Sequence, residues 1–412
     1  MAANGTRAVD ADAGRWPRRE EEEDEERLFG LSPRPSIDSF RALCSQETDP
    51  ERYPLAASIE GKVPVYELAP YETTSAEQRA ALQDEWYRVL LHGPGVFVAR
   101  RLFADGELLE RVSDVFRDII RRESASGAGR PGDHFAGAGA NDRIWNALGK
   151  HGAADPASFV AYYANPYLGL VSSAWLGPGY RMTAQVNSVR PGAPAQVCHR
   201  DYHLGFMPAE RCARFPRAAQ RASRCLTLQG AVAHVDVPPE AGPTRLLPFS
   251  QAFGPGYLAC RLPEFRDFFG AAHVALPLAR GDGLFFNPAL FHAAGENRSG
   301  HLHRLANLLQ VSSAFARPME AVDTLPLLDS CWDHLRRLYD RDGLSDRLMA
   351  FVAAIADGYP FPTNLDRNPP RSDEMAPLSE QDVLLECLAS GKDKSAALET
   401  MRSYVRSTKA GS

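Results

Sequence analysis

Between residues 181 and 315 the apolar residues come in short runs separated by turns, and this pattern constrains the fold more than any other feature of the chain. Glycine and proline stand between the runs. Many short strands at close spacing indicate a β-sandwich, a jelly roll or a barrel. Some runs are apolar at every position, so we expect both faces of the sheet to be covered, one of them by helices. The runs are 182–189, 225–237, 244–248, 273–278, 284–286 and 302–312.

Helical periodicity flanks this region on both sides. Before it, the apolar spacing predicts helices over about 74–91, 105–122 and 156–175, with a short strand at 95–99. After it, apolar stripes and a capping box that begins at Ser379 predict further helices up to the C-terminus. The chain is therefore expected to be an α+β protein in which the strands lie between two helical segments.

The N-terminal residues 1–55 differ in composition from the rest. They contain the acidic run 20–26 and the proline-punctuated stretch 32–36. Because like charges repel one another and stay solvated, we expect a disordered acidic tail. A partner-binding role for the acidic run is the alternative. We expect residues 56–317 to form one domain, helices first and strands second, and residues 318–412 to form a helical extension packed on that core.

Composition and charge limit the partners and the cellular compartment that we expect for this chain. The chain has 412 residues, a net charge of −6 and a sequence pI of about 6.0, so no nucleic-acid partner is expected. Seven cysteines without a CxxC pair indicate a reducing compartment. No apolar run reaches membrane-spanning length and no signal peptide is recognisable. We therefore expect a cytoplasmic protein without a membrane partner; the sequence indicates no particular protein partner.

Two imidazoles and one carboxylate carry the chemistry that the sequence indicates. His199 and Asp201 are two positions apart, and on an extended strand such side chains point the same way. His292 lies in a later apolar run of the same region. Two histidines and one carboxylate form the facial triad that holds non-heme Fe(II) and leaves coordination positions open. His203 shares the face of His199 if the strand continues, either near the metal or as an ordinary histidine.

Arginine supplies nearly all of the basic residues, and the segment Pro208–Arg224 is rich in it. Codon bias explains this composition; an anionic substrate held by several guanidiniums is the alternative. The arginine-rich segment is either a solvated surface insertion or a loop that grips the substrate.

In this order the residues resemble the phytanoyl-CoA dioxygenase family of Fe(II)/2-oxoglutarate-dependent oxygenases, over roughly Gly95–Phe315. Two positions depart from the family pattern: Phe249 stands where the family often has glycine, and Gln251 where it often has histidine. The segments that carry the resemblance are the strand 95–99, His199–Asp201, Ala241–Ser250, Gly281–Phe286, His292–Asn297 and Arg304.

The resemblance implies a double-stranded β-helix core of the jelly-roll or cupin-like type, flanked by N-terminal and C-terminal helices. It implies iron bound by His199, Asp201 and His292, and Arg304 paired with the distal carboxylate of 2-oxoglutarate, which the planar guanidinium fork fits. Arg298 is a competitor for that role, but it lies in a turn where we expect it to be exposed. The implied cofactor and co-substrates are Fe(II), 2-oxoglutarate and O2.

Two further residues, Gln196 and Thr244, resemble positions that help to hold 2-oxoglutarate in some relatives. Gln196 would face away from His199 unless a bulge intervenes. No side-chain general base is needed, so we predict no catalytic residue besides the metal ligands. An aspartate at position 201, where related halogenases have a small residue, favours hydroxylation or another outcome of hydrogen abstraction.

The predicted function is a dioxygenase that hydroxylates an unactivated C–H bond of a small organic substrate, of acyl or secondary-metabolite type, with release of succinate and CO2. One alternative is a metal-dependent hydrolase or isomerase on a cupin-like barrel, in which the same three residues hold zinc. Another is a binding protein without catalysis on the same fold. Arg304 separates these alternatives, because a hydrolase has no need for a distant carboxylate anchor.

Overall fold

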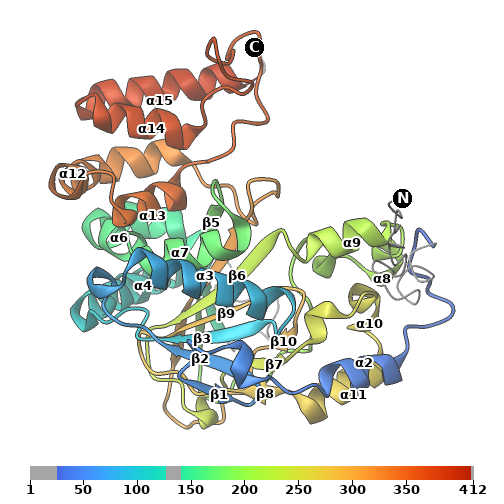
Figure 1. Ribbon diagram of the computed structural model, residues 1–412. Helices are drawn as coiled ribbons and strands as arrows, with labels where there is room; N and C mark the ends of the chain where they lie inside the picture. Colours follow the sequence, from blue (N-terminus) through green and yellow to red (C-terminus); the bar gives the residue numbers. More distant parts are fainter. Residues whose placement is uncertain (1–25, 127–140, 410–412) are drawn as a thin grey trace, which may run out of the picture.

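A computed structural model describes residues 26–126 and 141–409 of the chain (Figure 1). Within these residues the main sheet has eight strands in the order β1-β2-β3-β9-β6-β11-β5-β4, and a smaller sheet has three in the order β10-β7-β8. The strands are β1 (Ser58–Glu60), β2 (Val63–Glu67), β3 (Val96–Arg100), β4 (Asn141–Ile144), β5 (Arg181–Val189), β6 (Thr227–Ala233), β7 (Arg245–Leu247), β8 (Val274–Ala275), β9 (Gly283–Phe286), β10 (Phe291–Ala293) and β11 (Arg304–Ser312).

Both faces of the main sheet are buried, as the unbroken apolar runs predict. Every residue of β5 and of β6 is buried. Side chains alternate between the two faces: Phe97 and Phe285 join the cluster under the helices, whereas Val98 and Phe286 join a second cluster on the opposite face. That opposite face is the one from which β5, β6 and β11 line a cavity together with His292 of the small sheet. The predicted fold class, an α+β protein with a jelly-roll core and flanking helices, is confirmed.

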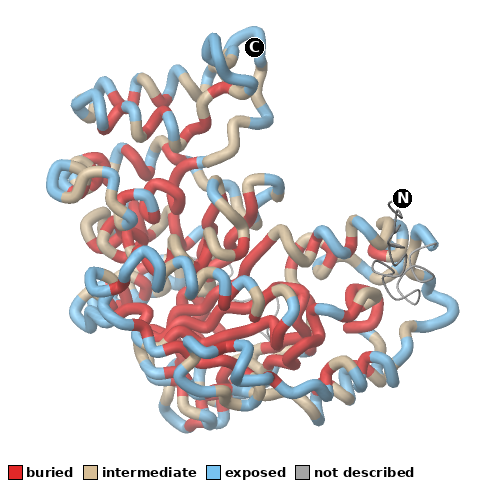
Figure 2. The backbone as a smooth tube through the Cα atoms, viewed as in Figure 1, coloured by how far each residue is buried: buried red, intermediate tan, exposed pale blue. Residues whose placement is uncertain are grey.

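Helices on the N-terminal side cover the first face of the main sheet. Trp86 of α3 stacks on Phe97 of β3 with the ring centroids 5.3 Å apart, and Figure 2 shows the buried residues gathered in the sheets and the helices next to them. These helices are α3 (Ala76–Leu91), α4 (Gly106–Ser126), α5 (Ala147–Ala154), α6 (Pro156–Tyr163) and α7 (Pro166–Leu176).

The prediction of one helix over 156–175 is wrong in one respect. The segment is divided into α6 and α7, because Asn165 caps a new helix that begins at Pro166. Proline has no N–H to donate and clashes with the preceding turn in a helix interior, but it fits the first turn. Helix α5 was not predicted at all.

The N-terminal tail also differs from the prediction. Residues 37–44 form helix α2 (Ile37–Cys44), and Phe40 is fully buried against Phe253, Phe265 and Phe291 with centroid separations of 4.8–5.0 Å. Because this aromatic contact offsets the ordering cost of a short segment, the chain is folded well before residue 55. The acidic run lies outside the described residues up to position 25.

Short helices occupy the excursions around the small sheet. They lie between β5 and β8 in the chain, and they are grouped beside the small sheet (Figure 1). These elements are η3 (His203–Phe206), α8 (Ala209–Cys212), α9 (Arg217–Ser223), η4 (Pro239–Ala241), η5 (Ser250–Ala252), α10 (Gly256–Ala259) and α11 (Pro263–Ala272). Two further short helices are η1 (Pro50–Arg52) and η2 (Tyr71–Thr73).

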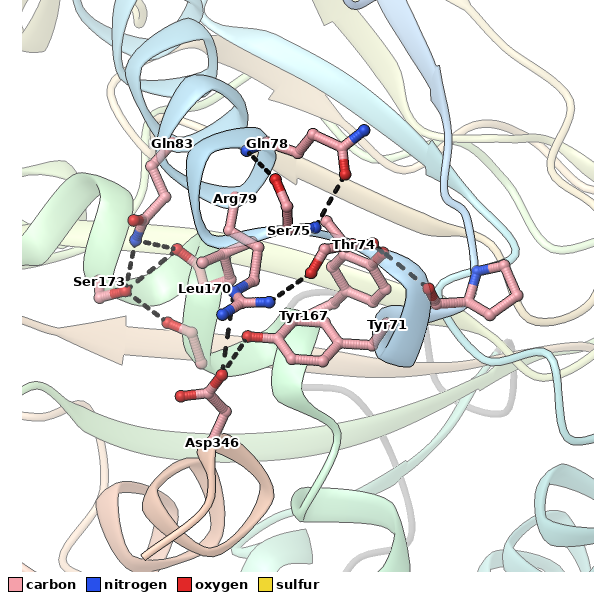
Figure 3. Close-up of polar contacts among 12 residues, drawn as sticks. Tyr71, Thr74, Ser75, Gln78, Arg79, Gln83, Tyr167, Leu170, Ser173 and Asp346 are labelled. Carbon is pink, nitrogen blue, oxygen red and sulfur yellow. Dashed lines mark hydrogen bonds and ion pairs between the residues drawn. The ribbon is translucent and has the colours of Figure 1, made fainter.

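Two C-terminal helices, α12 (Thr324–Asp342) and α13 (Asp346–Ile355), pack on the N-terminal helices. The last two, α14 (Glu380–Ala389) and α15 (Lys394–Thr408), form a further layer on α12 and α13. Figure 3 shows a polar contact at the junction with the N-terminal helices, where the Tyr71 hydroxyl donates to Asp346 at the start of α13 over 2.6 Å. Beside it, within the N-terminal helices, the Gln83 amide of α3 donates to Ser173 of α7 over 2.9 Å. Arg79 lies 3.9 Å from the same Asp346 carboxylate. No described helix is both long and apolar enough to cross a bilayer.

Candidate metal centre

His199 and His292 face each other across an isolated antiparallel bridge. Their rings lie 4.5 Å apart between centroids. Asp201 places one carboxylate oxygen 3.7 Å from His199 Nε2 and the other 3.5 Å from His292 Nε2. One ligand atom from each of the three residues lies within 4.8 Å of the others. The structure thus brings together the three side chains that the sequence indicated.

The hydrogen bonds of the two imidazoles set their tautomers. His199 Nδ1 lies 2.8 Å from the Val197 carbonyl oxygen, and His292 Nδ1 lies 2.8 Å from the Leu290 carbonyl oxygen. Because a carbonyl only accepts, each Nδ1 carries the proton and each Nε2 keeps its lone pair. Both lone pairs are on the side of Asp201, which is the arrangement that metal-binding histidines show.

Charge at the centre also suits a cation. Burial by itself would raise the pKa of the Asp201 carboxyl, but His199, His292 and Gln229 outweigh burial and hold it well below its usual range. Burial lowers the pKa of His199, and the neighbouring His292 lowers it further. At neutral pH the centre therefore offers the Asp201 carboxylate and the neutral imidazole of His199, the protonation states that metal binding requires.

The local backbone differs from the predicted strand. His199 forms only a single bridge, and Asp201 is held by the hydrogen bond from its N–H to the Pro288 carbonyl over 2.9 Å. His203 has φ +51° and begins a 3-10 helix, and its Nε2 lies 3.2 Å from the Arg317 carbonyl oxygen. The side chain of His203 consequently does not lie on the same face as that of His199. The alternative that places His203 near the metal is therefore wrong.

Arg200, between the two ligands, anchors the segment from behind. Its guanidinium is fully buried and donates to the carbonyls of Ser250 and Phe253 over 2.6 Å and 3.1 Å. It also lies 4.9 Å from the Tyr257 ring centroid. A Cβ on Gly256 would come within 2.0 Å of the Arg200 Cζ, so only glycine leaves room for this side chain.

Gln229 is a residue of the centre that sequence reasoning missed. It lies on β6, and its Nε2 donates a short hydrogen bond to Asp201 Oδ2. Since an ionised carboxylate only accepts, this bond fixes the orientation of the amide. The signal in the sequence is a polar side chain inside the otherwise apolar run Thr227–Ala233, at an inward position of a fully buried strand. The strand register places Gln229 opposite Gln310 on β11.

A cavity of about 610 Å³ opens at the three residues, and Arg304 lines it. Arg304 is the first residue of β11 and is 8% exposed. Burial lowers its pKa to about 10, so the side chain stays cationic at neutral pH. Within the described part of the chain its Nη1 is buried and has no hydrogen-bond partner. A buried cation without a partner is costly, so the arrangement fits an anion in this cavity.

Gln196 and Thr244 line the same cavity. The Gln196 side-chain oxygen accepts from the Ala294 N–H over 3.2 Å, which leaves its Nε2 as the group available to a ligand. Arg298 is exposed and does not line the cavity. Residues 208–224, the arginine-rich segment, also lie outside the cavity lining; instead three arginines from elsewhere, Arg143, Arg261 and Arg266, contribute to it.

Comparisons with known proteins place the chain in a family by its sequence. The sequence pattern of the family described as phytanoyl-CoA dioxygenase (PhyH) matches residues 75–306, more than half of the chain. No curated protein matches. Among solved structures, the non-heme alpha ketoglutarate dependent epimerase SnoN from nogalamycin biosynthesis is 20% identical, with a TM-score of 0.40 over 57% of this chain and 84% of its own. The carbocyclase SnoK of the same biosynthesis is 19% identical, with a TM-score of 0.39 over 59% of this chain and 86% of its own. By its sequence match, this chain belongs to the phytanoyl-CoA dioxygenase family of enzymes.

Proposed function

We propose that the chain is an Fe(II)- and 2-oxoglutarate-dependent dioxygenase that hydroxylates an unactivated C–H bond of a small organic substrate, with release of succinate and CO2. His199, Asp201 and His292 would hold the iron, since their donor atoms lie within 4.8 Å of one another. Iron bound by such a triad supplies the activation of O2 and the cleavage of the C–H bond. The polypeptide supplies orientation and a cavity between two sheets.

The observation that carries the proposal is the place of Arg304 relative to the three ligands. A cation with an unpartnered nitrogen lines the same cavity as the two imidazoles and the carboxylate. The guanidinium fork matches a carboxylate with two charge-assisted hydrogen bonds, so it would hold the distal carboxylate of 2-oxoglutarate. A hydrolase that uses zinc-bound water has no role for this group. Gln196 Nε2 and Thr244 Oγ1 are the further groups that we assign to 2-oxoglutarate.

Two residues next to the metal centre hold its ligand side chains in position. Gln229 orients the Asp201 carboxylate, and Arg200 holds the segment between His199 and Asp201 against the carbonyls of Ser250 and Phe253 at η5. No side chain is assigned as a general base. We also propose that residues 56–317, with the helix α2 that precedes them, form the dioxygenase domain, and that residues 318–412 form an extension that supports it.

Turnover tests the proposal. Purified protein is supplied with Fe(II), 2-oxoglutarate and ascorbate, and succinate is measured after air is admitted, with and without a metabolite extract as the source of substrate. We expect oxygen-dependent succinate formation that the extract stimulates and that His292→Ala abolishes. The matched control, His303→Ala, removes a histidine that does not line the cavity and should leave succinate formation unchanged. Equal succinate from wild type and His292→Ala would overturn the proposal.

A further inference from the structure

We propose that the substrate carries an anionic group, a carboxylate, phosphate or sulfate, that binds Arg261 and Arg266 at the mouth of the cavity. This inference rests on the proposed function, because it names the class of substrate on which the metal centre would act. The contacts that carry it are those of the two guanidiniums.

Among the described residues that line the cavity, basic side chains outnumber acidic ones. Asp201 is the only acidic residue among them, whereas the guanidiniums of Arg143, Arg261, Arg266 and Arg304 all contribute. Arg200 also borders the cavity, but its guanidinium is turned toward the carbonyls behind the ligand segment. The charges of a divalent metal ion, a 2-oxoglutarate dianion, the Asp201 carboxylate and the Arg304 guanidinium sum to zero. Three guanidiniums then remain, in a chain whose net charge is −6.

Two of the three have no acidic partner. Arg143 is left out, because it already interacts electrostatically with the Glu320 carboxylate. Among the described residues no carboxylate lies within 4.0 Å of the nitrogens of Arg261 or Arg266, and their hydrogen bonds go to backbone carbonyls, although three acidic residues are near them in the sequence or at the neighbouring helix α8. Those neighbours are Glu210, Glu264 and Asp267.

The two guanidiniums are held in position by backbone carbonyls. Arg261 Nη2 donates to the carbonyls of Gly205 and Met207 over 2.9 Å and 2.7 Å, so it is fixed to the segment that follows Asp201. Arg266 Nε donates to the Cys260 carbonyl over 3.3 Å, which leaves the two terminal nitrogens of its fork for a ligand. A guanidinium that is already oriented loses less conformational freedom on binding an anion.

Apolar side chains lie beside these cations. Val197 and Phe206 line the cavity and are 61% and 46% exposed, which is high for residues of their kind. Arg261 contacts the carbonyl of Gly205, the residue before Phe206. An anion with an apolar body would cover both kinds of side chain at once. We therefore infer an amphipathic anion as the substrate class.

Two fluorescent probes with one aromatic skeleton test this inference. Anilinonaphthalenesulfonate carries an anionic sulfonate and N-phenylnaphthylamine is its uncharged counterpart. Each is titrated into the full chain, into the double variant Arg261→Met/Arg266→Met, and into Arg298→Met, which removes an exposed guanidinium away from the cavity. We expect the double variant to bind the sulfonate about fivefold to thirtyfold more weakly, since two partly exposed ion pairs contribute about one to two kcal/mol. The uncharged probe should bind it as it binds wild type.

Competition identifies the anion. Naphthoate and naphthyl phosphate are added against the bound sulfonate probe, and the stronger competitor indicates a carboxylate or a phosphate substrate. Equal sulfonate affinity in wild type and the double variant, equal weakening of both probes, or the same loss in Arg298→Met would each overturn the inference. Failure of the proposed function is a separate result, because metal and 2-oxoglutarate binding are measured on the same protein without either probe.

Discussion

His199 and His292 exchange both of their backbone hydrogen bonds across one bridge, with N···O distances of 3.0 Å and 3.1 Å. Residues paired in this way project their side chains to the same face, so each backbone fixes the place of the other imidazole. The third ligand, Asp201, has no such bridge. It depends on the Pro288 carbonyl for its N–H and on Gln229 for its carboxylate. The backbone pairing thus positions the two histidines, whereas the position of Asp201 depends on the contacts with Pro288 and Gln229.

Replacing Gln229 by leucine should weaken metal binding by about tenfold to a hundredfold, because loss of a hydrogen bond to a ligand typically has that effect. Titration of the variant with Co(II), followed by visible absorption, measures both affinity and ligand geometry. Gln310→Leu is the matched control, since Gln310 lies directly opposite on β11 without a hydrogen bond to Asp201. Identical Co(II) affinity and spectrum in Gln229→Leu and wild type would show that Gln229 does not position the carboxylate.

Gly256→Ala should lower the free energy of unfolding by about 1–3 kcal/mol, the usual cost of overpacking a buried site, because the new Cβ collides with the Arg200 guanidinium. Urea unfolding checks this value. In Gly270→Ala the added Cβ meets open space within helix α11, so we expect a gain of about 0.5–1 kcal/mol from helix propensity. Equal stability of the two variants would contradict the packing argument for Arg200.

Arg304→Met should weaken 2-oxoglutarate binding by about tenfold to a hundredfold, the loss of a hydrogen-bonded charge pair, and leave metal affinity unchanged. Calorimetric titration of the Co(II)-loaded protein with 2-oxoglutarate measures the first quantity. Arg298→Met removes a nearby guanidinium that does not line the cavity and serves as the control. A loss of 2-oxoglutarate affinity in Arg298→Met with none in Arg304→Met would reverse our assignment.

Stability should fall on acidification through two buried histidines outside the metal centre. Burial lowers the pKa of His151 and of His234 to about 3 each, from an ordinary value of about 6.5. Both are neutral in the fold above pH 6.5, where the unfolded chain is neutral at these positions as well. Below this pH only the unfolded chain gains the protons, so each histidine costs up to about 1.4 kcal/mol per pH unit down to about pH 3.

The variant His151→Leu isolates one of these protons. The slope of the unfolding free energy against pH, measured by urea denaturation between pH 6.5 and pH 4 in metal-free protein, should decrease by about one proton relative to wild type. His301→Leu is the control, because that histidine is exposed to solvent in the loop before β11. An unchanged slope in His151→Leu would mean that this histidine already titrates normally in the fold.

The sequence predicted those parts of the fold that local patterns determine. Ser75 and Gln78 form the capping box of α3, and the buried strand at 96–100 follows that helix. The triad was recognisable because its residue types and their order are specific. The role of Gln229 was not, since it depends on the register of β6 beside the ligand segment, which is a long-range relation.

Tertiary contacts explain the remaining differences. Phe40 lies in a short helix of eight residues, and its burial depends on phenylalanines from distant parts of the chain that pack around it. Arg261 and Arg266 reach the cavity because α10 and α11 fold back onto the ligand segment. The arginine-rich segment at 208–224 had the stronger compositional signal, yet it lies outside the cavity lining. The composition of a segment shows its charge, but it does not show whether the side chains of that segment face the cavity.

One spectrum tests the central claim most directly: the absorption of the anaerobic protein with Fe(II) and 2-oxoglutarate. A metal-to-ligand charge-transfer band in the visible arises only when 2-oxoglutarate chelates iron that the protein holds. We predict this band for the wild-type chain, its loss in His199→Ala, and a higher half-saturating 2-oxoglutarate concentration in Arg304→Met. A band that persists unchanged in His199→Ala, or no band in the wild type at saturating Fe(II) and 2-oxoglutarate, would contradict the account.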